Sequence, residues 1–154
     1  MDQSPKRVGK RSVARLAIVQ ALYQQEFRQQ PMSEILEEFL SYRDGLPVME
    51  EETPQSDRAF FSEFLTEIAA KQEHIDALMA ERLTESWTLD HLDPVVRAIL
   101  RAGIFELLVR EDIPVQIVLN EYIELAKAFF EGKEPAFING VLHHVAQVVR
   151  SQKE

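Results

Sequence analysis

One apolar stretch, residues 93–110, constrains the fold of this chain more than any other feature of its sequence. It opens with Asp93 and Pro94, which is a typical helix start. The aspartate side chain accepts hydrogen bonds from the first amides, and proline lacks an amide that would have no partner at that position. Apolar residues then recur at helical spacing and spread well beyond a single stripe. The sequence therefore predicts a helix that other helices surround.

The arginines and the glycine of this stretch predict some of its contacts. Arg97 and Arg101 lie four residues apart, so they share one narrow face that we expect to reach solvent or a partner. Gly103 in a helix interior costs about 1 kcal/mol relative to alanine. We expect the close approach of another backbone to compensate for that cost.

The rest of the chain also shows helical patterns, and no segment alternates as a strand does. Loops of ordinary length favour antiparallel neighbours, so we predict an all-α fold, a compact antiparallel bundle of about seven helices. The polar segment 71–74 could divide the third pattern into two helices. Trp87, in the connector 84–90, is expected to pack rather than to have a functional role. The predicted helices run from near Val8 or Ser12 to about Gln29, from Ser33 to Gly45, from Ser56 to about Leu83, from Asp93 to Arg110, from beyond Pro114 to Gly132, and from Ala136 to Val149.

The net charge of −9 is unevenly distributed along the chain. Residues 1–15 contain five basic residues and one acidic residue, a net charge of +4, whereas the remaining 12 basic and 25 acidic residues give −13. Such an acidic body repels nucleic acid in general. Any nucleic-acid binding must therefore be local and directed by the basic N-terminal segment.

Composition and motifs exclude several classes of site. The chain has no cysteine, which excludes disulfides, thiolate metal sites and cysteine nucleophiles. It has no uninterrupted apolar run of about 18 residues and no apolar segment after its basic start, so we expect a soluble cytoplasmic protein. The sequence also contains no phosphate-binding loop, zinc-binding His-Glu-x-x-His motif or nucleophile elbow. We therefore expect no catalytic residues, no cofactor and no metal.

The start of the predicted first helix is the first of two segments suited to RNA. Arg11 and Arg15 lie four residues apart with Lys10 beside them. Like charges at that spacing repel one another, so stacking them on a helix is favourable only where they meet an anion. The alternative is a solvated basic tail without a particular role.

The second segment is residues 133–140. Lys133, Phe137 and Asn139 combine a cation, an aromatic ring and an amide. Single-stranded RNA is bound by such a set, because unstacked bases lie on aromatic rings, amides bind base edges and cations bind phosphates. The alternative is a core phenylalanine followed by an asparagine that hydrogen-bonds at a helix start.

Several separated motifs are specific when they are taken together. They are Arg15 with Val-Gln-Ala-Leu-Tyr at 19–23, Trp-Thr-Leu at 87–89, Arg-Ala-Ile-Leu-Arg at 97–101, Glu-Leu-Leu at 106–108, Ile-Pro at 113–114, Asn-Glu at 120–121, Glu-Leu-Ala-Lys at 124–127 and Phe-Ile-Asn-Gly-Val-Leu at 137–142. This set resembles the bacterial transcription antitermination factor family NusB. The resemblance covers nearly the whole chain, in the family's order and at its usual spacings.

The resemblance implies a fold of two small helical lobes, which we place at residues 1–83 and 84–154 of a single RNA-binding domain. It also implies a non-catalytic factor that binds the boxA element of ribosomal RNA leader transcripts as a heterodimer with NusE, a small-subunit ribosomal protein. In the family, that complex joins RNA polymerase with other Nus factors and suppresses premature termination in ribosomal RNA operons. A related domain is fused to ribosomal RNA cytosine methyltransferases, but we expect no catalytic domain here, because the sequence stops at Glu154.

The resemblance also implies which residues bind RNA. The family's arginine-rich helix start is matched here only in part, because Ser12 and Val13 stand where members often carry further arginines. We expect the basic residues to neutralise phosphates, and the aromatic and amide side chains to contact bases. The residues expected to bind RNA are Lys10, Arg11, Arg15, Lys133, Phe137 and Asn139.

The protein partner is expected on the side of the central helix that carries Arg97, Arg101 and Glu106. The acidic body and a basic ribosomal protein have complementary charges, which would steer their association. Two alternatives stay open. One is a helical adaptor that contacts only proteins and has no RNA preference. The other is a homodimer that buries the RNA-binding face as an autoinhibited store.

Overall fold

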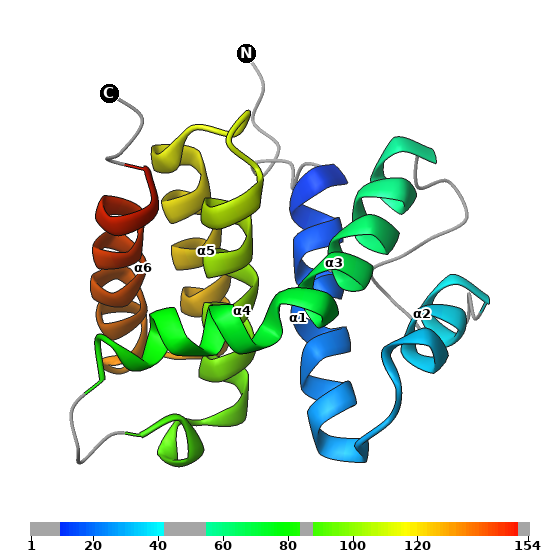
Figure 1. The fold of residues 1–154 in the computed structure, drawn as a ribbon, viewed down its shortest axis with the longest axis horizontal. Coiled ribbons are helices and arrows are strands. Elements are labelled where there is room, and N and C mark those ends of the chain that lie inside the picture. Colours follow the sequence, from blue (N-terminus) through cyan, green and yellow to red (C-terminus); the bar gives the residue numbers. More distant parts are fainter. Residues whose placement is uncertain (1–9, 42–54, 84–87, 151–154) are drawn as a thin grey trace. The chain divides into compact units, whose positions relative to one another are not determined.

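The computed structural model describes residues 10–41, 55–83 and 88–150, and every regular element within these ranges is a helix. Six α-helices and one short 3-10 helix confirm the predicted all-α fold (Figure 1). In this part of the chain, no helix combines the length and the apolar character that crossing a membrane requires. In chain order the elements are α1 (Lys10–Arg28), α2 (Met32–Ser41), α3 (Gln55–Ala80), η1 (Leu89–His91), α4 (Pro94–Val109), α5 (Val115–Phe129) and α6 (Glu134–Arg150).

Helix α3 runs without interruption through the polar segment 71–74, so the predicted division into two helices is wrong. Buried residues continue along it from Phe60 to Met79, while three of the four residues in 71–74 are exposed. A polar run on the solvent side of a helix leaves the backbone hydrogen bonds intact. Trp87, which we expected to pack, lies outside the described residues.

The chain divides into two compact units, Met1–Thr66 and Glu67–Glu154. The boundary lies inside α3, so the first part of this helix belongs to one unit and the second part to the other. The boundary expected near residue 83 was based on the end of a helical pattern in the sequence. The division in the structure follows instead the contacts that each part of the helix makes.

In the first unit, α1 and α2 pack against each other. Helix α3 adds the ring of Phe61, which stacks on Phe39 of α2 with the centroids 5.6 Å apart. A tight turn at Gln29 follows α1. Gln29 is the one non-glycine residue with a positive φ, 56°, in the described ranges.

The start of α2 differs from the predicted one. The carbonyl oxygen of Pro31 accepts hydrogen bonds from the amides of Glu34 and Ile35, so Pro31 precedes the first turn and Ser33 lies inside the helix. Ser33 is therefore not the N-cap. The predicted end at Gly45 lies outside the described residues.

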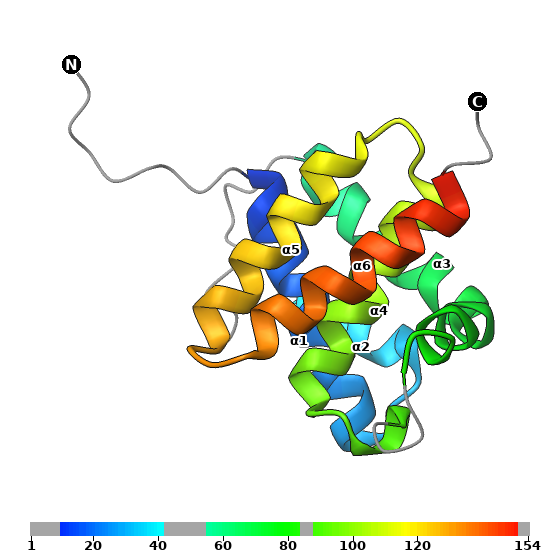
Figure 2. The same ribbon diagram turned by 90° about the vertical axis from the view of Figure 1, so that its left-hand side faces the viewer.

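Helix α4 is the centre of the second unit. It packs against α5 and α6, which also pack against each other, and Figure 2 shows α6 crossing in front of it. Its start is the predicted one: Asp93 Oδ1 accepts hydrogen bonds from the amides of Val95, at 2.7 Å, and Val96, at 3.4 Å. Ten of its residues, from Val96 to Leu107, are buried, as expected of a helix that others surround.

Gly103 allows α6 to lie close to α4. A Cβ atom at this position would be 2.9 Å from Cδ2 and 3.0 Å from Cδ1 of Leu142. The close contact predicted for this glycine therefore exists, but with a leucine side chain rather than with another backbone. The contact seats α6 on α4, which places the first turns of α6 near the start of α4.

Candidate nucleic-acid interface

Two arginines near the start of α1 share one aromatic ring. The guanidinium carbon of Arg11 lies 4.1 Å from the centroid of the Phe60 ring, and that of Arg15 lies 5.7 Å from it. Both distances fall within the range of about 6 Å for a cation–π interaction. Because Phe60 is itself buried, it offers a fixed surface to both guanidinium groups.

The two arginines differ in exposure, and this separates their roles. Arg11 is partly exposed, whereas Arg15 is only 4% exposed. A phosphate can reach Arg11 directly, but the burial of Arg15 contradicts the direct phosphate contact predicted for it. Lys10 is the first residue of α1, and its side chain lies outside what the structure describes.

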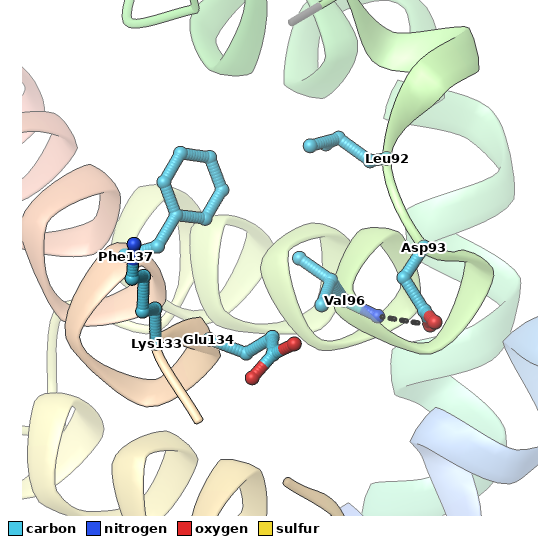
Figure 3. A pocket seen from close by; sticks show the side chains of 6 residues that line it. All are labelled: Leu92, Asp93, Val96, Lys133, Glu134 and Phe137. Carbon is cyan, nitrogen blue, oxygen red and sulfur yellow. Dashed lines mark hydrogen bonds between the residues drawn. The ribbon is translucent and has the colours of Figure 1, made fainter. Parts of the chain in front are cut away.

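Phe137 and Lys133 lie together at a pocket of about 430 Å³ in the second unit. Figure 3 shows the ring of Phe137 and the side chain of Leu92 pointing toward each other across this hollow, with Val96 below them. Phe137 is partly exposed, so it is not the core residue of the alternative interpretation. The charged side chains that complete the lining are Asp93, Lys133 and Glu134.

Asn139 faces a different hollow, which is more open and lies between α5 and α6. Helix α6 begins at Glu134 rather than at the predicted Ala136, so Asn139 lies in its second turn and not at its start. Residues two apart on a helix point about 200° away from each other. Phe137 and Asn139 therefore cannot contact the same base. The other side chains with amide or amino groups at this hollow are Gln116, Asn120 and Lys127.

Arg97 and Arg101, which we expected to face a protein partner, both hold the second unit together. Arg97 Nη1 donates hydrogen bonds to the carbonyl oxygens of Leu89, at 2.6 Å, and Leu92, at 3.0 Å. Arg101 makes a two-pronged ion pair with Asp76 of α3, with Nε–Oδ1 and Nη2–Oδ2 distances of 2.9 and 3.0 Å. Both arginines keep part of their surface exposed, so these contacts do not preclude a partner.

Glu106, the third residue expected at the partner surface, is fully buried. Its Oε1 accepts a hydrogen bond from the hydroxyl of Tyr122, at 2.6 Å, which joins α4 to α5. A side chain without exposed surface cannot touch a partner, so this part of the prediction is wrong. The pairing instead satisfies a carboxylate inside the helical core.

Sequence reasoning missed three residues that form the contact under Arg11 and Arg15 and the pocket at Phe137. Phe60 lies far from Arg11 along the chain, and no local pattern indicates that its ring underlies two arginines. Val96 has the spacing of an ordinary core residue. Leu92 carried the one usable signal, because an apolar residue directly before an N-cap often packs against the helix that follows.

The side chains gathered at these places are suited to binding rather than to bond chemistry. They are cations, aromatic rings and amides, which bind phosphates, base faces and base edges respectively. Among the described residues, no three histidine, aspartate or glutamate side chains are placed to hold a metal ion.

The chain matches the NusB family over residues 12–147. Relatives named transcription antitermination protein NusB align over almost their whole length. That of Caulobacter vibrioides is 44% identical over 96% of this chain and 99% of its own length. That of Sphingopyxis alaskensis is 42% identical over the same shares, and that of Sinorhizobium fredii is 42% identical over 99% of this chain and 95% of its own length.

Solved structures share the fold. NusB of T. maritima, 30% identical, superimposes with a TM-score of 0.80 over 99% of this chain and 98% of that one. A chain from the crystal structure of antitermination factors NusB and NusE in complex with dsRNA is 22% identical, with a TM-score of 0.72 over 90% of this chain and 97% of that one. The motif resemblance is thereby confirmed, and with it the expectation of a non-catalytic factor. This chain belongs to the NusB family of transcription antitermination proteins.

Proposed function

We propose that this protein is an antitermination factor that binds the boxA RNA of ribosomal RNA leaders together with NusE in the cytoplasm. Its family membership and its likeness in fold to a chain crystallised with NusE and dsRNA support the proposal. The resulting complex joins RNA polymerase with other Nus factors and suppresses premature termination.

The position of Arg11 is the observation that carries the proposal. Its guanidinium lies 4.1 Å above the ring of Phe60 and stays partly exposed. A guanidinium that is already held in place loses less side-chain freedom when it binds a phosphate. Arg11, with Lys10 beside it, therefore neutralises RNA phosphates, while the buried Arg15 helps to hold the shared ring.

In the second unit, three residues of α6 and the loop before it contact the RNA. Phe137 offers its ring to an unstacked base, and the exposed Lys133 beside it binds a phosphate. Asn139 offers its amide to the edge of another base, because it faces the hollow on the α5 side of α6.

NusE approaches the acidic body of the chain, where the charge outside residues 1–15 is −13. Opposite charges steer such an encounter and raise its rate. The partly exposed Arg97 and Arg101 are the proposed contacts on the α4 side. Glu106 has no part in this surface, because it is buried.

Fluorescence anisotropy tests the proposal directly. A labelled single-stranded boxA RNA and a scrambled RNA of equal composition are titrated with the protein, with and without NusE, at several salt concentrations. We expect a preference for boxA that NusE strengthens. Arg11→Ala should reduce the slope of log affinity against log salt by about 0.7, the value for one lost phosphate contact on a single strand. Arg82→Ala, which removes an exposed arginine after α3, is the control with the same charge change.

Two outcomes contradict parts of this proposal. Equal or absent binding of both RNAs, with and without NusE, leaves the family assignment intact but moves the function to an adaptor that contacts only proteins. If boxA is preferred but the salt slope of Arg11→Ala is unchanged, the RNA-binding function stands. The start of α1 is then not the site that binds the phosphates.

A further inference from the structure

Gly140 is exposed in the interior of α6, and its lack of a side chain has no explanation in the packing of the described residues. We infer that the bound RNA strand crosses α6 over Gly140, with one base on the Phe137 side of the helix and another on the Asn139 side. This inference rests on the proposed RNA binding. It adds the path of the strand and the residue that keeps this path open.

A glycine at this position costs stability. Helix α6 runs from Glu134 to Arg150, so Gly140 lies well inside it. Glycine in a helix interior is less favourable than alanine, because it loses more backbone freedom on folding. At Gly103 of α4 the structure contains the reason, since a Cβ atom there would be 2.9 Å from Leu142. At Gly140 a Cβ atom would meet no such neighbour within 4 Å among the described residues. The surface over Gly140 is therefore open to a molecule outside the chain.

Gly140 lies on the exposed side of α6 between the two hollows. Asn139 lines the hollow between α5 and α6, and Phe137 lines the one at the start of α4. Because each residue turns a helix by about 100°, Gly140 is about 100° from Asn139 in one direction and about 60° from Phe137 in the other. A strand that reaches both hollows over the solvent side of α6 therefore passes over Gly140.

The width of a helix makes a close passage necessary. A helix with its side chains is about 10–12 Å across, whereas stacked nucleotides advance only about 3.4 Å each along a strand. Two bases on opposite sides of α6 therefore cannot be stacked neighbours, and the strand between them must be extended. A side chain at position 140 would lengthen the path, and glycine keeps it short. A duplex holds its bases paired and stacked, so only a single strand can cross in this way.

The hollow on the α5 side offers amide groups to the base that arrives there. Gln116 and Asn120 line it together with Asn139, and all three side chains are exposed. Gln116 Nε2 donates a hydrogen bond to Asn120 Oδ1, at 3.1 Å. This bond uses one donor and one acceptor, so each amide keeps further groups for a base edge. A strand that has crossed Gly140 therefore meets amides from both α5 and α6.

Two substitutions of Gly140 test the crossing. Gly140→Ala should raise the midpoint of urea unfolding, because alanine is the better helix former and its methyl group meets no neighbour. The same variant should bind boxA RNA more weakly, measured by anisotropy with NusE present. Gly140→Gln should weaken this binding further, by at least about fivefold, which corresponds to the loss of one base contact. Ala70→Gln places the same side chain at an exposed site within α3 and should bind as the wild type does.

A double variant tests whether Gly140 lies between the two base contacts. Asn139→Ala should weaken boxA binding in the wild-type background, because the base on the α5 side loses a partner. In Gly140→Gln the strand no longer reaches that hollow, so adding Asn139→Ala should have almost no further effect. Adjacent residues of a helix do not face each other, so the two side chains should not couple directly. In the Ala70→Gln background, Asn139→Ala should have its full effect.

The outcomes separate this inference from the proposed function. If both Gly140 variants bind boxA RNA as the wild type does, the crossing is wrong and RNA binding stands. If Asn139→Ala has its full effect in Gly140→Gln, the strand reaches the α5 side by another path and the inference is overturned. If the Gly140 variants weaken NusE binding but not RNA binding, a protein covers Gly140 and the inference is again overturned. If the wild type does not bind boxA RNA, both proposals fail. Gly140→Ala carries the test if urea unfolding shows that Gly140→Gln does not fold.

Discussion

Phe60 determines how the arginines of α1 are presented, although it is buried and faces no ligand itself. Two arginines one helical turn apart repel each other by a few tenths of a kcal/mol, about 0.2–0.5. A cation–π contact offsets this with about 0.5–1 kcal/mol for each guanidinium. A residue that does not touch RNA is therefore expected to influence RNA affinity.

Replacing the ring tests this dependence. Phe60→Leu keeps an apolar side chain but removes the π surface, so the Kd for boxA RNA should rise about two- to fivefold. Phe61→Leu truncates the neighbouring buried ring, which stacks on Phe39, and should lower stability without this effect on RNA. Anisotropy titrations and urea unfolding of both variants give the comparison. Equal losses of RNA affinity would show that general packing of α3, not the ring under Arg11, is responsible.

Glu38 makes the turn between α1 and α2 sensitive to pH. Its carboxylate accepts hydrogen bonds from Gln30 and Gln24, both at 2.8 Å. These bonds, that of Gln30 first, and the nearby Arg28 hold the pKa of Glu38 below its ordinary value of 4.5. A group whose pKa is lower in the folded state stabilises the protein above the unfolded pKa, and this stabilisation is lost as the pH falls through the folded pKa.

The prediction for Glu38 is a difference in pH dependence. As the pH falls below 4.5, the wild type should lose free energy of unfolding faster than Glu38→Gln, which cannot titrate. Urea unfolding from pH 7 down to about pH 3 measures both curves. Glu37→Gln, at the exposed neighbouring position, should follow the wild type. Parallel curves for wild type and Glu38→Gln would exclude the role given to these hydrogen bonds.

Among the elements, α6 stabilises the end of α4 through its last residue, Arg150. The guanidinium donates hydrogen bonds to the carbonyl oxygens of Leu107, at 2.6 Å, Arg110, at 2.9 Å, and Ile113, at 3.0 Å. The last carbonyl groups of a helix have no partner within it, and positive charge is favourable at that end. Arg150 therefore holds the end of α4 and the turn that leads to α5.

Arg150→Met should lower the free energy of unfolding by at least about 2 kcal/mol, because several hydrogen bonds to a charged group are lost together. Arg150→Lys should recover only part of this, since an ammonium cannot reproduce the planar fork of a guanidinium. Arg82→Met, at an exposed position after α3, serves as the control and should be nearly neutral. Urea unfolding of the three variants checks the order, and a lysine variant as stable as the wild type would contradict it.

The start of α4 was predictable because the groups responsible for it are close in sequence. Asp93 caps α4 through amides two and three residues away, and this local chemistry was visible in the chain. The break expected at 71–74 was wrong because those residues lie on the solvent side of a continuous helix. Ser33 was a plausible cap by residue type, but Pro31 supplies the first carbonyl acceptor.

The site was predictable in residue type but not in arrangement. Phe137 and Asn139 point away from each other, because a step of two residues turns a helix by about 200°. Arg15 is buried, and its guanidinium lies near the ring of Phe60, which comes from a helix distant in sequence. Leu92 and Val96 became part of a site only when α6 placed Phe137 opposite them. Each of these facts depends on contacts between helices, which periodicity within one helix does not encode.

At the scale of the whole molecule, the uneven distribution of charge along the chain attracts two kinds of partner to different segments. Residues 1–15 carry +4 and the rest carry −13. A polyanion is attracted only to the basic segment, whereas a basic protein is attracted to the rest. The two partners should therefore respond differently when the same charges are removed.

The association rate constant for NusE provides the test, because long-range charge steering affects the encounter more than the final contacts. Stopped-flow mixing should show that this rate constant falls at least about tenfold between low and high salt. Lys10→Gln with Arg11→Gln makes the net charge two units more negative than −9. NusE should therefore associate with this double variant as fast as with the wild type or faster, while boxA RNA binds more weakly and with a smaller salt slope. A double variant that lost both partners equally would show that one surface serves both, and a rate constant independent of salt would exclude steering by the acidic body.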